Sequence, residues 1–277
     1  MRNSTLILAA AIAIGAMAGI GAASAADLAE RPYAKAPVVD TSYHWSGWYV
    51  GGNAGYGFSS NSTSIYGLDP GGVVRADLFL PPALSENRNG FLGGLQFGVN
   101  YQTGNIVAGV EADLDAGRVR GSSQGPPFVV AGPTFITSST ETNLDWFGTV
   151  RGRLGVSAFD RSLFYATGGL AYGRATSSFN ATHSSGACTS VVNLCLANSA
   201  QKWMSGWTLG AGWEYAIAGN WSTKLEYLYY DLGVIDNVLT PLNGTQNITF
   251  GTSTRMNGNI VRAGLNYRFS GPVVAKY

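Results

Sequence analysis

The sequence predicts an all-β fold, an eight-stranded antiparallel up-and-down β-barrel. Apolar and polar residues alternate with period two over eight segments of about ten residues, which is the pattern of strands with two different faces. The connections between these segments alternate between tight turns and long polar loops, as they do in transmembrane barrels. Glycine is abundant, at 38 residues, and charged residues make up only 12 % of the chain, whereas about 25 % is usual in soluble domains.

The first residues have the three parts of a secretory signal peptide. Arg2 supplies the basic start, Leu6 to about Ile20 the apolar stretch, and Ala23-Ser24-Ala25 the cleavage site. Small residues follow the apolar run and no basic flank does, which favours a signal peptide over a membrane anchor. The expected order along the chain is a signal peptide (1–25), a proline-containing periplasmic linker (26–44), the barrel (45–269) and a C-terminal extension (270–277).

The eight expected strands follow one another from residue 48 onward. They are WYVGGNAGYGF (48–58), GFLGGLQFGVNYQ (90–102), IVAGVEADLD (106–115), NLDWFGTVRGRLG (143–155), LFYATGGLAYGR (163–174), KWMSGWTLGAGWEY (202–215), WSTKLEYLYYDL (221–232) and GNIVRAGLNYRF (258–269). The short connections TGN, SAFDR and AIAGN predict tight turns. The others, 59–89, 121–140, 176–201 and 233–254, are rich in Ser, Thr, Asn and Gly and predict long loops.

Each segment has one apolar and one polar face. In the first, Trp48 and Tyr56 share a face and Asn53 lies on the other. In the fourth, the apolar face is expected to hold Leu144, Trp146, Val150 and Leu154, and the polar face Asn143, Asp145, Arg151 and Arg153.

Alternation alone does not say which face is inside. A soluble, lipocalin-like ligand-binding barrel places its apolar face inside, whereas a transmembrane barrel places it outside. Three features favour the transmembrane form. The polar faces carry glycines and amides rather than many lysines and glutamates, aromatic residues cluster near the segment ends, and the chain is exported. A closed barrel also pairs every backbone group, as lipid requires.

The polar faces therefore bring charged side chains into one lumen. The expected members are Glu111, Asp113, Asp115, Asp145, Arg151, Arg153, Glu214, Lys224, Glu226, Arg262 and Arg268. An eight-stranded lumen is just wide enough for side chains to fill, so these charges should pair with one another. A structural ion-pair core is the first interpretation, and a narrow path for small solutes, as in a porin, is the alternative.

The motifs GWYVGGNAGYGF, DWFGTVRGRLG, YATGGLAYG, GWTLGAGWEYAIAGNWSTKLEYLYYDLG and VRAGLNYRF resemble the porin-like outer-membrane immunogenic proteins of alphaproteobacteria. These are small barrels similar to the OmpA transmembrane domain, and the likeness begins at about Trp45. It implies a barrel in the outer membrane of a Gram-negative bacterium, with a structural or surface-interaction role as a surface antigen and in envelope integrity, and with no cofactor. Such barrels typically end on an aromatic residue that the barrel-assembly machinery reads, and both Phe269 and Tyr277 fit that role.

An enzyme is not expected. The chain has two histidines, and His44 precedes the first strand whereas His183 falls in a loop at the opposite end, so the two cannot serve one site. Cys188 and Cys195 lie seven residues apart in a polar segment of an exported chain, which predicts a local disulfide. Two thiolates do not complete a metal site, even with His183 nearby. A net charge of +1 gives no reason to expect nucleic acid.

Three arginines are expected at the outer rim of the barrel. Arg118 and Arg120 follow Leu114 with the parity of the lipid face, and Arg174 follows Tyr172 in the same way. They are candidates for charge-assisted hydrogen bonds to lipopolysaccharide phosphates, the alternative being solvated side chains. The surface loops carry no motif that names a partner.

Overall fold

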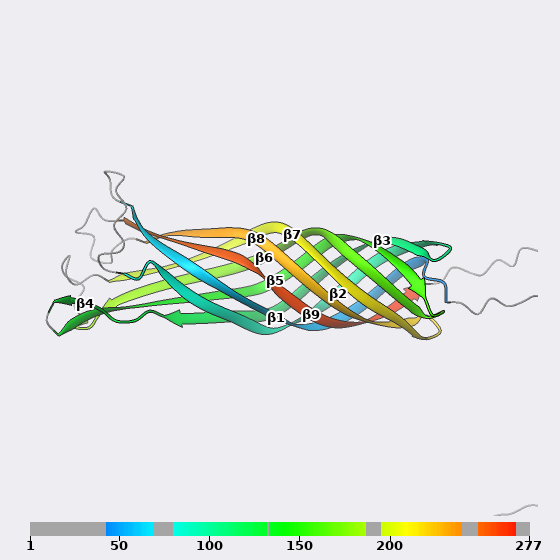
Figure 1. Ribbon diagram of the computed structural model, residues 1–277, viewed down its shortest axis with the longest axis horizontal. Coiled ribbons are helices and arrows are strands. Elements are labelled where there is room, and N and C mark those ends of the chain that lie inside the picture. The colour runs from blue at the N-terminus through cyan, green and yellow to red at the C-terminus, as the bar shows by residue number, and fades with distance from the viewer. Residues whose placement is uncertain (1–42, 69–79, 132, 187–194, 240–248, 270–277) are drawn as a thin grey trace, which may run out of the picture. The chain divides into compact units, whose positions relative to one another are not determined.

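The computed structural model describes residues 43–68, 80–131, 133–186, 195–239 and 249–269 (Figure 1). The expected signal peptide, nearly all of the linker and the C-terminal extension lie outside the described residues. Within the described ranges the regular secondary structure consists of strands. No membrane-spanning helix is found in those ranges. The strands are β1 (Gly47–Leu68), β2 (Ala83–Thr103), β3 (Ile106–Gln124), β4 (Phe128–Ala131), β5 (Thr134–Ala158), β6 (Ser162–His183), β7 (Leu196–Ala218), β8 (Trp221–Leu239) and β9 (Thr249–Phe269).

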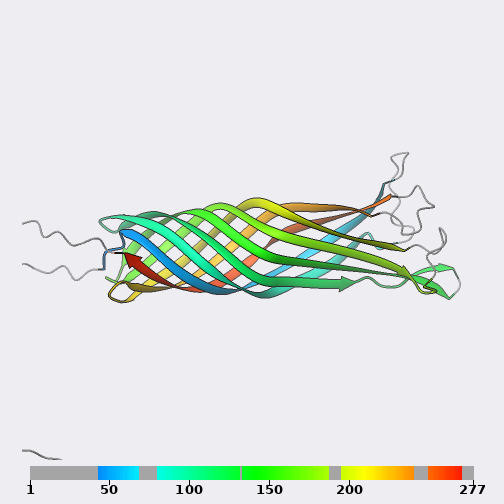
Figure 2. The same ribbon diagram turned by 180° about the vertical axis from the view of Figure 1, so that it is seen from behind.

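Eight of these strands close into a barrel. β1, β2, β3, β5, β6, β7, β8 and β9 each pair antiparallel with the strand on either side, and the pairing of β3 with β5 completes the ring. The first and last strands meet, because Trp48 of β1 lies opposite Phe269 of β9. Figures 1 and 2 show all eight winding around one axis. The predicted eight-stranded barrel is confirmed, with the short β4 added as a hairpin partner of β5 alone.

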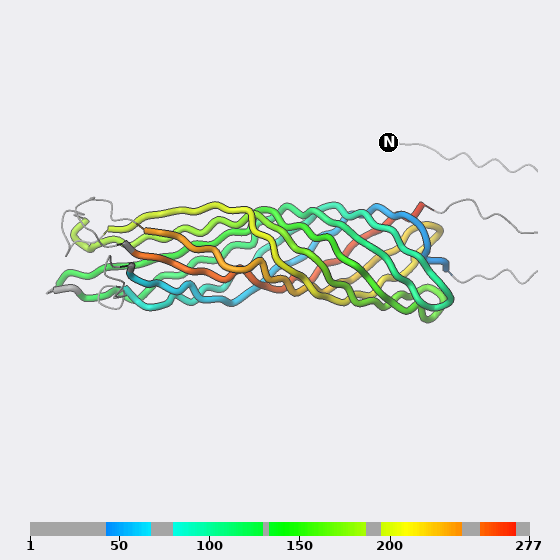
Figure 3. Tube along the Cα trace, turned by 90° about the horizontal axis from the view of Figure 1, so that it is seen from above, coloured from blue at the N-terminus to red at the C-terminus, as the bar shows by residue number. Residues whose placement is uncertain are grey.

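The three predicted tight turns lie at one end of the barrel, which we call the turn end. They join β2 to β3, β5 to β6 and β7 to β8. Gly104 and Gly219 adopt φ of 57° and 52° there, which glycine reaches without strain. The end of β9 lies at this same end, as the tube in Figure 3 shows. We call the opposite end the loop end.

The strands are much longer than the sequence pattern predicted. Each of the eight has 19 to 25 residues, whereas about 9–11 suffice to span a membrane. The predicted loops 59–89, 121–140, 176–201 and 233–254 were therefore wrong at their edges, because strands continue into all four. Ser, Thr and Asn indicated loops there, but in the structure these residues lie on both faces of strands. Asn180 is exposed, whereas Thr63 and Thr254 are buried in the interior.

The strand faces exchange polarity partway along the barrel, as β6 shows most clearly. Toward the turn end, its outward side chains are apolar or aromatic and include Phe164 and Leu170, which are 49 % and 66 % exposed. From Arg174 onward, the outward residues are Arg174, Thr176, Ser178, Asn180 and Thr182. Its inward residues there include Phe179 and Ala181, both buried. We call the part of the barrel beyond this exchange, which has an apolar core and a polar outward face on β6, the extension.

A β-bulge in β5 corrects one sequence prediction. The register with both neighbouring strands shifts around Asp145, between Leu144 and Trp146 on the β6 side. Leu144 was expected to face lipid with Trp146, but it is 4 % exposed and packs inside the barrel. The extra residue of a bulge reverses the side-chain parity on its far side. A strict period of two could not reveal it.

The interior is filled in layers along the barrel. At the turn end, Trp45 packs with Val107, Leu163, Tyr165 and Ala216. Next comes a layer of charged side chains, described below. A larger apolar layer follows, made of Leu92, Val119, Leu144, Phe147, Ala171, Ala175, Met204, Leu228, Tyr230, Leu232, Ile235, Met256 and Ile260. The extension has its own core of Ile65, Leu80, Leu84, Ile136, Phe179, Ala181, Leu196, Leu239 and Phe250.

Glu86 and Arg88 are buried between the two apolar layers of the loop-end half. They lie in a segment predicted to be a loop, so the sequence reasoning missed them. Glu86 Oε2 accepts a hydrogen bond from Thr142 Oγ1 at 2.9 Å, and Arg88 Nη2 donates to the Arg255 carbonyl at 3.1 Å. Burial raises the pKa of the Glu86 carboxyl above its ordinary value, in spite of the hydrogen bonds from Thr142 and the nearby Arg88.

The ring of hydrogen bonds is incomplete in the extension. Among the described residues, backbone pairing of β7 with β8 reaches only to Trp207 opposite Asp231. Beyond that point β7 still pairs with β6, and β8 with β9. One side-chain contact bridges the gap, from Asn198 Nδ2 to the Val238 carbonyl.

Tyrosine rings cover glycines on neighbouring strands at five cross-strand pairs. They are Tyr49–Gly98, Tyr66–Gly251, Tyr165–Gly212, Tyr172–Gly148 and Tyr230–Gly258. A Cβ atom at Gly98 would lie 2.3 Å from Tyr49 Oη, so no other residue fits beneath that ring. The absent side chain thus leaves the space in which the aromatic ring packs.

Gly98→Ala should therefore lower the free energy of unfolding by about 1–3 kcal/mol, the usual cost of overpacking. Tyr49 cannot move aside cheaply because Glu111 and Arg153 hold its hydroxyl. Gly152→Ala is the matched control, since its added Cβ would meet nothing closer than 3.9 Å. Denaturant unfolding followed by tryptophan fluorescence measures both, and equal stability of the two variants would contradict the packing described.

Candidate functional site: a charge network that closes the lumen

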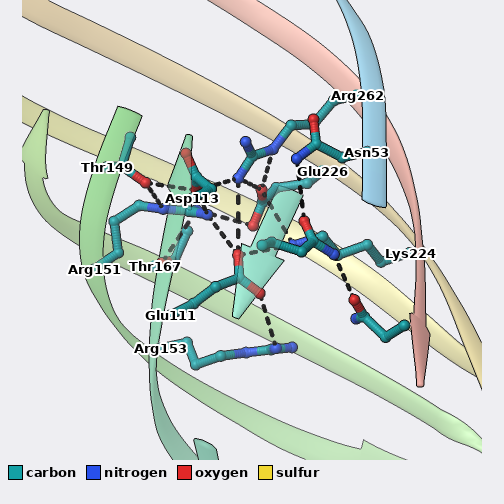
Figure 4. Close-up of polar contacts among 12 residues, drawn as sticks. Asn53, Glu111, Asp113, Thr149, Arg151, Arg153, Thr167, Lys224, Glu226 and Arg262 are labelled. Atoms are coloured by element: carbon teal, nitrogen blue, oxygen red, sulfur yellow. Dashed lines mark hydrogen bonds and ion pairs between the residues drawn. The ribbon is translucent and has the colours of Figure 1, made fainter. Parts of the chain in front are cut away.

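Nine charged side chains meet inside the barrel between the two apolar layers nearest the turn end, and Figure 4 labels all of them except Asp115 and Glu214. They come from β3, β5, β7, β8 and β9, and none is more than 4 % exposed. The members are Glu111, Asp113, Asp115, Arg151, Arg153, Glu214, Lys224, Glu226 and Arg262. Because strands return to one face at every second residue, Arg151 and Arg153 both point inward from the same short segment.

Arg151 lies at the centre of the network. Its Nη2 donates to Glu111 Oε1 at 2.6 Å and to Asp113 Oδ2 at 2.9 Å. Its Nη1 donates to Glu226 Oε1 at 2.9 Å, and its Nε to Thr149 Oγ1 at 2.7 Å. One guanidinium thus contacts three carboxylates, using the planar set of donors that only arginine provides.

Arg262 and Lys224 complete the pairing on the opposite wall. Arg262 contacts Asp113, Asp115 and Glu226 at 2.8, 3.1 and 2.7 Å. Lys224 Nζ donates to Glu111 Oε1 at 2.8 Å. Figure 4 shows these side chains converging from separate strands on Glu111 and Asp113 of β3.

Two tyrosines belong to the network although the sequence reasoning did not include them. Tyr49 Oη donates to Glu111 Oε2 at 2.7 Å and accepts from Arg153 Nη1 at 2.9 Å. Tyr165 Oη donates to Glu226 Oε1 at 3.0 Å, and its ring centroid lies 4.0 Å from Arg153 Cζ. Tyrosine counts as apolar in a hydropathy pattern, so it was not assigned to the polar face. The spacing could have revealed Tyr49, because it lies four residues before Asn53 and therefore on the same, inward face of the strand.

Arg153 reaches toward the turn end, where its Nη2 donates to Glu214 Oε2 at 2.7 Å. Glu214 Oε1 accepts further hydrogen bonds from Ser222 at 2.6 Å and Asn266 at 2.9 Å. Five carboxylates thus face four cations, with hydroxyl and amide donors satisfying further acceptor positions. A network paired in this way holds its charges at a tolerable desolvation cost.

Two predicted members lie outside the network. Asp145 sits in the bulge of β5, half-buried, and accepts a hydrogen bond from Asn143 at 2.6 Å. Arg268 lies at the turn end, where it donates to the Ser46 carbonyl at 3.3 Å and its Cζ lies 4.2 Å from the Tyr43 ring centroid. The bulge removed Asp145 from the inward face. Arg268 has the right parity, but its position near the end of β9 carries it past the carboxylates.

Apolar layers close the lumen on both sides of the network. Toward the turn end, Trp45 is 1 % exposed, and its backbone N–H donates to Gln102 Oε1 at 2.6 Å. Toward the loop end, the rings of Phe147 and Tyr230 pack with centroids 5.0 Å apart. The charges are therefore sealed from water on both sides, and the lumen is a packed interior.

The remaining candidate residues lie apart from the charge network. Arg118 and Arg120 are exposed on β3, and Arg174 is half-buried on β6. His44 is at the turn end, and His183 ends β6 at the loop end. Among the described residues no group of three or more His, Cys, Asp or Glu side chains could hold a metal ion. Cys195 is buried, whereas Cys188 lies outside the described residues, so their disulfide stays a prediction, as does the choice between Phe269 and Tyr277.

Residues 9–269 match the family model described as the outer membrane protein beta-barrel domain. The chain belongs to this family. It is 36 % identical over 264 residues to the 31 kDa outer-membrane immunogenic protein of Brucella melitensis, covering 92 % of this chain and 97 % of the relative. It is 30 % identical over 187 residues to a 22 kDa outer membrane protein of Rhizobium leguminosarum, covering 68 % of this chain and 64 % of that protein. The outer membrane protein OprG from Pseudomonas aeruginosa shares the fold, with a TM-score of 0.52 at 13 % identity over 83 % of this chain and 99 % of OprG.

These similarities confirm the resemblance drawn from the sequence motifs. The protein is an integral outer-membrane β-barrel of a Gram-negative bacterium. A surface or structural role fits this family, and neither the soluble binding barrel nor the porin is favoured. We expect the apolar outward face of the turn-end half to contact lipid, and because the short turns of such barrels are periplasmic, we expect the extension to stand outside the cell.

Proposed function

We propose that the protein is a closed, non-conducting and non-catalytic barrel that holds a rigid extension above the outer membrane. Its role is then mechanical and interactive, contributing to envelope integrity and presenting a surface to the surroundings. The observation that carries this proposal is the sealed lumen, in which the charge network is packed between the Trp45 layer and the layer around Phe147. A path for solutes would need polar space through these layers.

The absence of catalysis is part of the same proposal. The carboxylates that could serve as acid and base are bonded to arginine or lysine in a sealed interior, where no substrate can approach them. The two histidines lie at opposite ends of the barrel, so they cannot act together as general base and partner in one catalytic site.

Planar-bilayer recordings test the closed lumen. The full-length protein, inserted at single-molecule level, should give no stepwise current, because apolar layers block the lumen on both sides of the network. A known porin reconstituted in the same bilayers shows that insertion and recording work. Reproducible unitary steps from the wild-type protein would overturn the proposal and favour the small-solute porin instead.

A further inference from the structure

Four cationic side chains lie on one side of the barrel, at the level where its outward residues change from apolar to polar. They are Arg118 and Arg120 of β3, Arg174 of β6 and Lys202 of β7. The strands that carry them are neighbours through β5, because Trp146 lies opposite Arg174, and Arg174 lies opposite Trp203. We call these four residues the cationic rim.

The cationic rim keeps an excess of positive charge after its local carboxylates are counted. Arg120 is already paired with Glu141 on β5. Asp145, the other acidic group of this rim, accepts a hydrogen bond from Asn143. Arg174 Nη2 donates to Gln201 Oε1 at 2.6 Å, which orients its guanidinium along the barrel surface. Four cations therefore face two carboxylates on this side.

The opposite side of the extension has no such excess. Among the described residues of β1, β2, β8 and β9 beyond the apolar band, the charged ones outside the interior pair Glu86 and Arg88 are Arg255, Asp231 and Asp236. Arg255 forms an ion pair with Asp231, which leaves Asp236. The positive field of the extension is thus confined to the β3–β7 side.

The depth of the cationic rim suits a lipid headgroup. Trp146 and Trp203 lie opposite Arg174 on the two neighbouring strands and face outward, 39 % and 60 % exposed. Tryptophan in that position marks the boundary between hydrocarbon and headgroups. Arg174 is level with both tryptophans and Lys202 is the residue adjacent to Trp203, so the charged ends of these side chains lie at the height expected for the headgroup layer.

A polar groove of about 320 Å³ lies beyond the cationic rim on the same strands. It is lined by Ser122, Ser123, Gln124, Ser139, Thr140, Glu141, Ser178 and Asn180. Hydroxyls and amides both donate and accept hydrogen bonds, which matches the hydroxyl groups of a sugar. Phosphate-binding cations and a sugar-matching groove therefore follow each other outward from the membrane.

We propose that this side of the barrel binds a phosphorylated glycolipid of the outer leaflet, with its phosphates on Arg118, Arg174 and Lys202 and its outer sugars in the groove. Arginine binds phosphate through paired N–H donors, and the lysine adds a point charge. The inference goes beyond the closed, structural barrel proposed above. Lipid attached at one side also gives the barrel a preferred orientation toward its lipid neighbours.

The test compares binding of three probes to the full-length protein in zwitterionic phospholipid nanodiscs. The probes are bisphosphorylated lipid A carrying its core oligosaccharide, lipid A without the core, and dephosphorylated lipid A. The triple variant Arg118→Gln, Arg174→Gln, Lys202→Gln should lower the affinity for both phosphorylated probes at least tenfold. Dephosphorylated lipid A should bind wild type and variant equally and weakly. Arg255→Gln on the opposite side is the matched control and should change binding less than twofold.

Two further arms separate the parts of the site. Ser122→Trp fills the groove and should remove the advantage of the core-bearing probe over lipid A alone, leaving binding of lipid A unchanged. Sodium phosphate in millimolar excess should displace the probes only weakly, and efficient displacement would reduce the site to a simple anion site and overturn the proposal. Unchanged affinity of the triple variant would overturn it too, as would an equal loss in Arg255→Gln. Heat-modifiable gel migration confirms that each variant is folded, and none of these outcomes depends on whether the lumen conducts.

Discussion

Arg151→Met should lower the free energy of unfolding by about 3–5 kcal/mol, the usual cost of breaking a buried ion pair by removing one partner. The reason is the position of Arg151 between Glu111, Asp113 and Glu226, all within 2.9 Å of its guanidinium. Without that guanidinium, five buried carboxylates face three cations. Methionine retains much of the side-chain length and apolar contact, so the loss reports on charge rather than on a cavity. Equilibrium unfolding in denaturant, in detergent or lipid, measures the change.

Two companion variants decide what the loss means. Val150→Ala changes the adjacent residue on the lipid face and should cost much less than Arg151→Met. Combining Arg151→Met with Glu226→Gln removes one surplus carboxylate, so the double variant should lose less than the sum of the two single changes. Strict additivity, or an Arg151→Met protein as stable as the wild type, would show that these groups do not interact as described.

Leu170→Arg should destabilise the barrel by about 2–4 kcal/mol, the cost of an arginine on the lipid face near the bilayer centre. Leu170 lies on the outward face of β6, 66 % exposed, within the apolar band. The substituted arginine places its guanidinium in hydrocarbon, where it has neither water nor a carboxylate to bind. Unfolding in phospholipid vesicles is the appropriate measurement, because detergent softens the lipid environment.

Asn180→Arg is the matched control for this prediction. Asn180 lies on the same face of the same strand, ten positions further along, beyond the exchange of polarity. It is exposed to water in the extension, so the same substitution should change stability by no more than about 0.5 kcal/mol. A similar loss at both positions would mean that the membrane also covers the extension, and no loss at either would mean that the outward face of β6 does not contact lipid.

The two pairs of variants test different consequences of one architecture. The charge network gives the turn-end half a polar interior beneath its apolar exterior, whereas the extension has an apolar core and a polar outward face on β6. We therefore expect the same eight strands to contact lipid over one half of their length and water over the other. A barrel that continues beyond the membrane in this way presents strand surfaces, rather than only loops, to whatever it meets outside the cell.

Prediction from sequence succeeded where the alternation of residue types was strong. The eight strands, the three tight turns and most inward charges follow from a period of two along each segment. Prediction failed in the loop-end half, where runs of polar residues belong to strands and not to loops. Polar residues indicated a loop from residue 176 onward, but β6 continues as a strand through Thr176, Ser178 and Asn180, and these side chains face water.

In the candidate site, the sequence predicted which residues face the lumen but not which residues bind one another. Arg151, Glu111 and Glu226 could be placed in one lumen by parity alone. Their actual partners could not, because strands distant in the chain, such as β3 and β8, face one another only when β1 pairs with β9 and the ring closes. Tyr49 and Tyr165 were missed because a tyrosine has an apolar ring and a polar hydroxyl, and only its neighbours decide which part matters.

Residue order alone is enough to predict an exported, glycine-rich, alternating chain that closes as an eight-stranded barrel in the outer membrane. Local periodicity carries that information, since each strand has one face for lipid and one for the interior. Three features emerge only from the folded barrel: the bulge at Asp145 turns Leu144 inward, Arg268 lies away from the carboxylates, and the strands continue beyond the membrane. These features depend on register and on which surfaces meet across the barrel, and residue order along one strand does not contain them.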